Sequence, residues 1–207
     1  MNILAIVGSA RKGKATDTLV DKAIEGLLSK DKNKAKIKKI NLHDYTIKFC
    51  KDCLTCRDTQ SDAPFVDCIL KDDMRDLSKL LYESDAIIFG SPLHMGHVPG
   101  IVMTFLERIC WTFSKPEASY VTVKGCPAPR GEKKRKAIII IPNSIVPPLY
   151  RKFCDTATAT IRGVLRDTVN TKTVGDLYAG NLEARGVECY LDKAYKLGQK
   201  LYLSSVK

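Results

Sequence analysis

The chain has 207 residues, with 34 lysines and arginines against 23 aspartates and glutamates, and a formal net charge of +11. This length allows one sizeable hydrophobic core, and no Pro/Gly/Ser-rich segment divides it, so we expect a single domain over residues 1–207. No apolar run approaches the ~18 residues of a membrane span and no signal-peptide pattern opens the chain, which predicts a cytoplasmic protein without a membrane segment.

The positive charge favours acidic partners, which include phosphate-bearing cofactors, nucleic acid and anionic surfaces. Lysines are spread through the chain, with short basic runs at residues 36–39 and 133–136, and no aromatic residues are interleaved with them for base stacking. A solvated basic surface therefore explains the charge better than nucleic-acid binding does.

The first predicted element is a buried strand at residues 3–7, which ends at Gly8. A basic loop leads from it to a helix expected at residues 16–28. Unpaired N–H groups at a helix start carry the positive end of the macrodipole and bind anions. Ser9 and Thr16 add hydroxyls, and Arg11 adds a planar fork of donors for phosphate oxygens.

This loop lacks both the GxxxxGK signature of triphosphate sites and the GxGxxG signature of dinucleotide sites. A monophosphate is therefore the simpler ligand. The alternative is an ordinary surface turn after the first strand.

Residues 35–42 follow as a half-exposed second strand. Residues 43–71 show no convincing hydrophobic periodicity and contain closely spaced cysteines, so we expect a long cysteine-bearing loop. Loops of this length are usually functional. A helix is predicted over residues 74–84, capped by Asp72 and Asp73.

The second half of the chain alternates strands and helices in the same way. The predicted strands are 86–89, 137–141 and 171–178; the helices begin near Pro99, near residue 147 and near residue 187, and residues 114–136 are predicted as a loop. Five strands alternating with helices predict an α/β sandwich with a parallel sheet. Its ligand site should lie where the loops 8–16, 90–97 and 142–144 leave the carboxyl ends of the strands.

Four separated motifs stand in a characteristic order: Gly8-Ser9-Ala10-Arg11-Lys12 through Thr16, Asp72-Asp73-Met74, Gly90-Ser91-Pro92-Leu93-His94-Met95-Gly96, and Phe105-Leu106-Glu107-Arg108. Together they resemble the NADPH-dependent FMN reductase and iron-sulfur flavoprotein group of flavodoxin-like proteins, over roughly the first half of the chain. The resemblance implies a flavodoxin-like three-layer sandwich with a five-stranded parallel sheet of order 2-1-3-4-5. It also implies bound FMN, NAD(P)H as a reductant, and a homodimer or homotetramer whose contacts help to enclose the flavin.

Carried over to this chain, the resemblance places the FMN phosphate on Ser9, Arg11 and Thr16, with Lys14 as a further candidate. The isoalloxazine ring would lie along the segment that consists of Pro92, Leu93, His94, Met95 and Gly96.

The family often has aromatic residues where His94 and Met95 stand, which leaves the substrate open. From the residues alone, His94 either donates a hydrogen bond to the ring or faces solvent. Asn143 is a candidate polar contact from the third loop, and no residue is expected to act as a nucleophile.

Eight cysteines without a secretory signal indicate thiols or metal ligands before disulfides. Cys50, Cys53 and Cys56 form a C-x₂-C-x₂-C run, and Cys68 follows after a gap of eleven residues. Three thiolates at this spacing, with Cys68 as the fourth ligand, predict a [4Fe-4S] cluster. Zinc ligation and cluster-free thiols are the alternatives. The single cysteines 110, 126, 154 and 189 are interpreted as buried or idle thiols.

The leading hypothesis is an FMN-dependent oxidoreductase that carries electrons between FMN and a [4Fe-4S] cluster, with a ferredoxin-like or other redox partner. A cluster-free NAD(P)H-dependent FMN or quinone reductase is the first alternative. A basic, zinc-stabilised nucleic-acid-binding module is the second, although the chain carries no nucleic-acid-binding motif.

Overall fold

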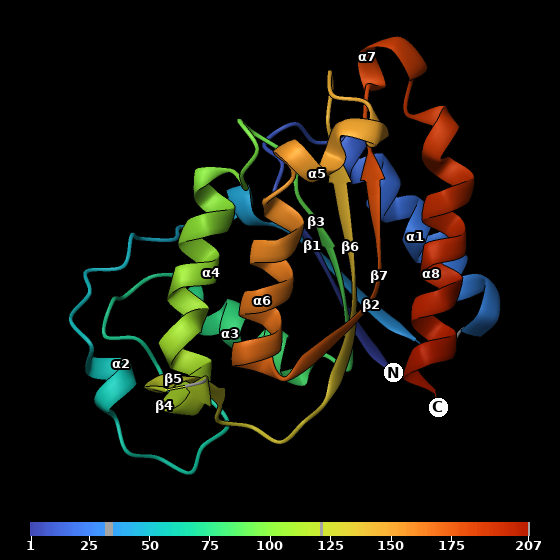
Figure 1. Cartoon of the computed structure of the whole chain (residues 1–207). Coiled ribbons are helices and arrows are strands. Elements are labelled where there is room, and N and C mark those ends of the chain that lie inside the picture. The colour runs from blue at the N-terminus through green and yellow to red at the C-terminus, as the bar shows by residue number, and fades with distance from the viewer. Residues whose placement is uncertain (32–34, 121, 207) are drawn as a thin grey trace.

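A central parallel sheet lies between two layers of helices in the computed structural model, which describes residues 1–31, 35–120 and 122–206 (Figure 1). The sheet contains β1 (Asn2–Val7), β2 (Lys36–Asn41), β3 (Ala86–Gly90), β6 (Arg135–Pro142) and β7 (Thr171–Ala179). Within the described residues its strand order is β2-β1-β3-β6-β7, and every neighbouring pair is parallel. Taken in chain order, these are the five strands of the predicted 2-1-3-4-5 arrangement.

The side chains of β1 alternate between the two faces of the sheet, as the period of a strand requires. Ile3, Ala5 and Val7 belong to one buried cluster, and Leu4 and Ile6 belong to the other. Each face therefore has its own apolar core, and the sheet is covered on both sides.

One layer is formed by α1 (Ala15–Asp31) and α8 (Leu191–Ser205), and the other by α3 (Met74–Glu83), α4 (Gly100–Phe113) and α6 (Ala157–Val169) (Figure 1). Shorter elements lie in the connections: η1 (Leu42–Asp44), α2 (Thr55–Asp58), η2 (Pro148–Tyr150), α5 (Arg151–Cys154), α7 (Leu182–Arg185) and η3 (Glu188–Tyr190). Among the described residues, no helix combines the length and the apolar character needed to cross a membrane.

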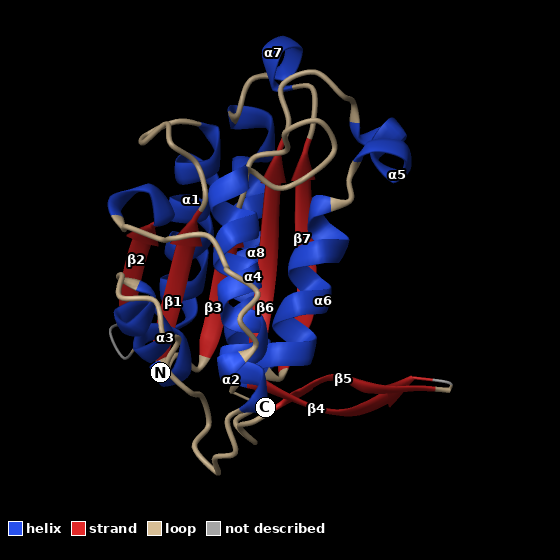
Figure 2. Cartoon of the chain, turned by 90° about the vertical axis from the view of Figure 1, so that its left-hand side faces the viewer, coloured by secondary structure: helices blue, strands red, loops and turns tan. Residues whose placement is uncertain are grey.

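The prediction of a loop over residues 114–136 is wrong for most of its length. β4 (Ser114–Tyr120) and β5 (Val123–Pro129) pair as an antiparallel hairpin that projects from the body of the protein (Figure 2), so the fold has strands beyond the five predicted. The prolines and glycine in this segment weaken the strand pattern in the sequence, and the hairpin's side chains are mostly half-buried or exposed.

The long helix expected from residue 147 is also divided, into η2, α5 and α6. The carboxylate of Asp155 accepts a hydrogen bond from the N–H of Thr158 at 3.0 Å. Asp155 therefore satisfies an otherwise free donor where α6 begins, and the chain turns between α5 and α6.

The contact between α1 and α8 requires a glycine at position 198. A Cβ there would collide with the carbonyl oxygen of Ala23 in α1, whereas a Cβ at Gly163 in α6 has nothing within 4 Å. Gly198→Ala is expected to lower the free energy of unfolding by about 1–3 kcal/mol through overpacking. Gly163→Ala, the matched helical control, should raise it by about 0.5–1 kcal/mol because alanine favours the helix. Urea unfolding of both variants checks this, and an unaffected Gly198→Ala protein would contradict the packing of α1 on α8.

Candidate functional site

A cleft of about 270 Å³ opens at the carboxyl edge of the sheet. It is bounded by the loop between β1 and α1 and by the segments that follow β3, β6 and β7. Its lining residues are Ser9, Arg11, Lys14, Ala15, Thr16, Pro92, Leu93, His94, Pro142, Asn143, Ser144, Leu182 and Glu183. Ligands of open parallel sheets bind at this edge, so the cleft stands where the strand order predicts a site.

The structure thus brings most of the predicted binding residues together, but it leaves Met95 and Gly96 outside the cleft lining. His94 and His97 exchange two backbone hydrogen bonds of 2.9 Å, and φ is positive at both residues between them, +50° at Met95 and +84° at Gly96. Such a tight turn directs the Met95 side chain outward, where it is 99% exposed.

Several lining residues were not predicted: Ala15, Pro142, Ser144, Leu182 and Glu183. Pro142 and Ser144 flank Asn143 in the loop 142–144, which the sequence places at the carboxyl edge. Leu182 and Glu183 lie in α7, just after β7, so applying the same rule to the fifth strand would have found them.

The loop after β1 is shaped to receive an anion. Ser9 and Thr16 are buried, and the Gly8 N–H donates to the Gly90 carbonyl at 2.8 Å, which joins this loop to the end of β3. At the start of α1, Thr18 N–H donates to the Lys14 carbonyl at 2.9 Å. The N–H groups of residues 15–17 precede this first helical donor, so they have no carbonyl partner within the helix and remain available to a ligand.

Some charged side chains in and around this loop form ion pairs that stabilise it, and others are available to a ligand. Lys12 pairs with Asp44 at 2.5 Å, and Lys39 pairs with Asp17 at 2.5 Å. Within the described residues, no carboxylate pairs with Arg11 or Lys14, and both line the cleft. Two cationic side chains beside free helix N–H groups favour a phosphate.

Asp17 holds the turn that carries these cations. Its carboxylate accepts a hydrogen bond of 2.6 Å from Gly13 N–H in addition to the ion pair with Lys39. Burial acts to raise the pKa of Asp17, but the hydrogen bonds from Lys39 and Gly13 outweigh it and hold this pKa below its ordinary value. Asp17 is therefore ionised at neutral pH and fixes the loop through Gly13.

Asn143 links the segments after β6 and β7. Its side-chain carbonyl accepts hydrogen bonds from Ile145 N–H at 3.0 Å and Val146 N–H at 2.6 Å, and its backbone N–H donates to the Ala179 carbonyl at 2.9 Å. The Nδ2 group has no partner among the described residues. Asn143 therefore has a structural role in its turn and retains a donor for a ligand.

The cysteine segment, residues 45–73, runs beside α4 and includes the short helix α2 (Figure 1). Cys50 and Cys53 are exposed, and Cys56 and Cys68 are half-buried. Among the described residues, no three Cys, His, Asp or Glu side chains stand close enough to hold a single metal ion. Burial raises the pKa of the Cys56 thiol above its ordinary value.

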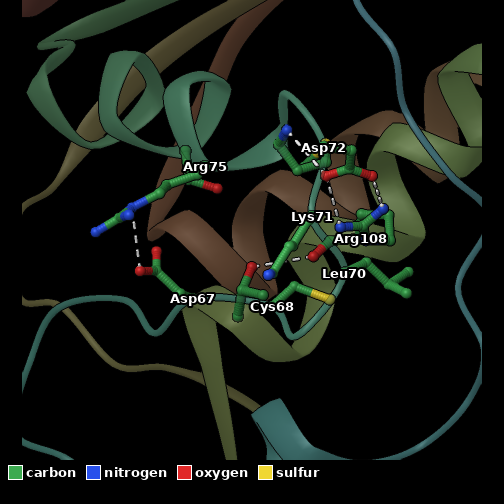
Figure 3. Close-up of a pocket in the computed structure, with 10 residues that line it drawn as sticks. Asp67, Cys68, Leu70, Lys71, Asp72, Arg75 and Arg108 are labelled. Atoms are coloured by element: carbon green, nitrogen blue, oxygen red, sulfur yellow. Dashed lines mark hydrogen bonds and ion pairs between the residues drawn. The ribbon is translucent and has the colours of Figure 1, made fainter.

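A second cavity, of about 380 Å³, adjoins this segment (Figure 3). Arg108 Nη1 donates to Asp72 Oδ2 at 2.6 Å and Nη2 donates to Asp72 Oδ1 at 3.1 Å. Both side chains are almost fully buried, and Arg108 also donates to the Lys48 carbonyl at 2.7 Å. This bidentate pair fastens both ends of the cysteine segment to α4.

Three buried guanidinium Nε–H groups, those of Arg57, Arg108 and Arg130, have no hydrogen-bond partner among the described residues. All three border the cysteine segment: Arg57 lies in α2, Arg130 donates to the Cys56 carbonyl at 2.9 Å, and Arg108 lines the cavity with Cys68. Buried donors normally find acceptors, so this region fits a group that is anionic and accepts hydrogen bonds.

A family model described as NADPH-dependent FMN reductase matches residues 1–124. Two curated proteins named iron-sulfur flavoprotein, both from Archaeoglobus fulgidus, are 29% identical over 109 residues and 36% identical over 108 residues. The alignments cover 53% and 52% of this chain but 46% and 48% of those proteins, so the chain spans about half the length of the curated relatives it matches.

Among solved structures, an FMN-dependent NADH-azoreductase from Bacillus anthracis, in complex with FMN, matches with a TM-score of 0.65. The match covers 100% of both chains at 12% sequence identity. At this identity the similarity establishes a shared fold.

Proposed function

The chain belongs to the NADPH-dependent FMN reductase family, and from that premise we propose that it is a flavin-dependent oxidoreductase that binds FMN in the cleft at the carboxyl edge of the sheet. One observation carries the proposal: Ser9, Arg11 and Thr16, the residues predicted to hold a phosphate, line one cleft with the start of α1. Hydroxyls, free N–H groups and unpaired cations there match the donors that a phosphate monoester needs.

In this proposal, Ser9, Thr16 and the first N–H groups of α1 donate to the phosphate, and Arg11 and Lys14 neutralise its charge. Pro92, Leu93 and His94 form the wall along the ring. Asn143 Nδ2 is a further donor. Bound FMN supplies the redox chemistry, which is hydride acceptance from NAD(P)H and one- or two-electron transfer, so the protein contributes binding, orientation and electrostatics.

We also propose that the chain works as a homodimer or homotetramer. The cleft, at about 270 Å³, is smaller than the ~300 Å³ at which typical ligand pockets begin, so one chain encloses only part of the flavin. Met95, Leu149 and Phe153 are large, exposed apolar residues, at 99%, 80% and 88% exposure, and suit contact with a second copy. The subunit number is measurable by light scattering with FMN bound.

A [4Fe-4S] cluster is the second group that we propose. Its support is the C-x₂-C-x₂-C run, the name of the two curated relatives, and the unsatisfied guanidinium donors around the cysteine segment. A thiolate-bound iron-sulfur cluster is anionic and accepts hydrogen bonds at sulfur, so it fits these donors. Cys50, Cys53 and Cys56 would supply three thiolates, and a ferredoxin-like protein is the expected class of redox partner.

A cluster-free NAD(P)H-dependent FMN or quinone reductase is the second candidate. The observation that favours it is the separation of the thiols, since no three metal-binding side chains of the described residues converge on one ion position. The family match weighs against the third hypothesis, a zinc-stabilised nucleic-acid-binding module.

Purification without air separates these functions. The proposal predicts stoichiometric FMN together with iron and sulfide, and NAD(P)H oxidation that depends on FMN. Flavin without iron would support the cluster-free reductase. A protein that binds no FMN would contradict the proposed function.

Cys53→Ser is expected to remove the cluster iron and leave FMN in place, because no residue of the cysteine segment lines the flavin cleft. Iron, sulfide and flavin assays on the same sample measure both groups. Cys189→Ser changes an exposed cysteine outside the segment and serves as the control. Full iron content in Cys53→Ser would exclude Cys53 as a ligand.

A further inference from the structure

Cys50 and Cys110 face a common hollow. The hollow has a volume of about 420 Å³. It is lined by Cys50 and Asp52 from the cysteine segment, by Met103, Leu106, Glu107, Cys110 and Trp111 from α4, and by Val164 from α6. A cysteine distant in the sequence is thereby brought to the C-x₂-C-x₂-C run.

The faces of α4 separate Cys110 from Cys68. Met103 and Cys110 are seven residues apart and therefore share one helix face. Arg108 and Thr112 are four residues apart on another face, and both line the cavity of Figure 3 together with Cys68. The hollow that contains Cys50 and Cys110 and the cavity that contains Cys68 thus open on different sides of α4.

The backbone around Cys68 is anchored on both sides. Before it, Val66 N–H donates to the Thr112 carbonyl at 2.8 Å; after it, Asp72 forms the buried pair with Arg108. Moving Cys68 to the other hollow would break contacts of this anchored stretch, whereas Cys110 already faces Cys50.

Two arginines lie near the hollow, whose own charged lining residues are Asp52 and Glu107. The guanidinium of Arg57 lies over the Trp111 ring, 5.4 Å from its centroid, and its Nε–H has no partner among the described residues. The Nε–H of Arg130 also has no partner among the described residues, while its Nη2 group donates to the Cys56 carbonyl. Neither arginine lines the hollow, so the two guanidinium groups would reach an anionic cluster only from its edge.

From these contacts we infer that Cys110 supplies the fourth thiolate of the cluster, with Cys50, Cys53 and Cys56, and that Cys68 is not a ligand. The inference rests on the proposed cluster. Each cysteine binds iron as a thiolate and releases its proton to solvent. The cluster would then bridge the cysteine segment and α4.

The test uses the full chain with FMN bound, reconstituted without air with ferrous iron and sulfide. Cys110→Ser, Cys68→Ser and the control Cys126→Ser are compared with the natural sequence by iron and sulfide assay and by electron paramagnetic resonance after reduction. We expect about four irons per chain in the natural sequence, Cys68→Ser and Cys126→Ser, and loss of the [4Fe-4S] signal with most of the iron in Cys110→Ser. Circular dichroism and FMN content verify that each variant is folded.

A Cys68→Ser protein that loses its iron overturns the inference, and so does a Cys110→Ser protein with the full content. If Cys110→Ser does not fold, full iron and an unchanged spectrum in Cys68→Ser, Cys126→Ser, Cys154→Ser and Cys189→Ser still support Cys110, the one remaining cysteine outside the run. A natural sequence that takes up no iron overturns the cluster itself, while its FMN content tests the flavin site separately.

Discussion

Replacing Asp72 by alanine is expected to lower the free energy of unfolding by about 3–5 kcal/mol, because the substitution leaves the Arg108 guanidinium buried without its counter-charge. The Arg108 side chain is 1% exposed and the Asp72 side chain 0%. Asp72 also accepts hydrogen bonds from Lys48 N–H at 2.9 Å and Met74 N–H at 3.2 Å. Urea unfolding at pH 7 measures the loss.

Asp67→Ala is the matched control for this variant. Asp67 lines the same cavity (Figure 3) and pairs with Arg75 at 3.3 Å, but both side chains are more than half exposed. Its removal should change stability by less than about 1 kcal/mol. Equal effects of the two substitutions would show that the buried pair has no special role.

The same pair predicts a dependence of stability on pH. Burial acts to raise the pKa of Asp72, but the hydrogen bonds from Arg108, Lys48 and Met74 outweigh it, so the pKa of the folded state lies below its ordinary value. The stabilisation is then complete above the unfolded pKa of about 3.9 and is lost as the pH falls through the folded pKa. The difference in stability between the natural sequence and Asp72→Ala should therefore shrink below about pH 4.

Arg11→Ala is expected to weaken FMN binding by about 1.5–3 kcal/mol, or about ten- to a hundredfold, because it removes a charge-assisted hydrogen bond to the phosphate. Arg11 lines the cleft and is exposed, so its loss should leave the fold intact. Fluorescence titration of the apoprotein with FMN measures the change.

Lys12→Ala tests whether any cation of this loop would have the same effect. Lys12 is adjacent to Arg11 but pairs with Asp44 and does not line the cleft. Its substitution should change FMN affinity by less than about threefold. An Arg11→Ala protein with unchanged affinity would refute the assignment of Arg11 to the phosphate.

The five strands and the position of the cleft could be predicted because they depend on local patterns, whereas the strand order 2-1-3-4-5 was implied by the family resemblance. Apolar runs such as residues 86–89 and 137–141 identify buried strands, and the loops after them meet at one edge in any parallel sheet. The same logic located Ser9, Arg11 and Thr16. The five-stranded core and its order are confirmed.

The features that prediction missed have different physical causes. The β4–β5 hairpin lacks a clear apolar face, because it projects from the body and is punctuated by prolines. The outward direction of Met95 follows from a turn with positive φ at a non-glycine residue, which local sequence disfavours. Spacing along the chain also does not reveal that Cys110 in α4 and Cys50 line one hollow.

We propose that the loop after β1 binds the phosphate of FMN, and a comparison of FMN with riboflavin tests this binding. The two ligands share the ring and the ribityl chain and differ only in that phosphate. Titration of the apoprotein should show FMN binding at least about a hundredfold more tightly, because several charged or helix-terminal donors act on the phosphate alone. Equal affinity for the two flavins would show that this loop does not bind the phosphate.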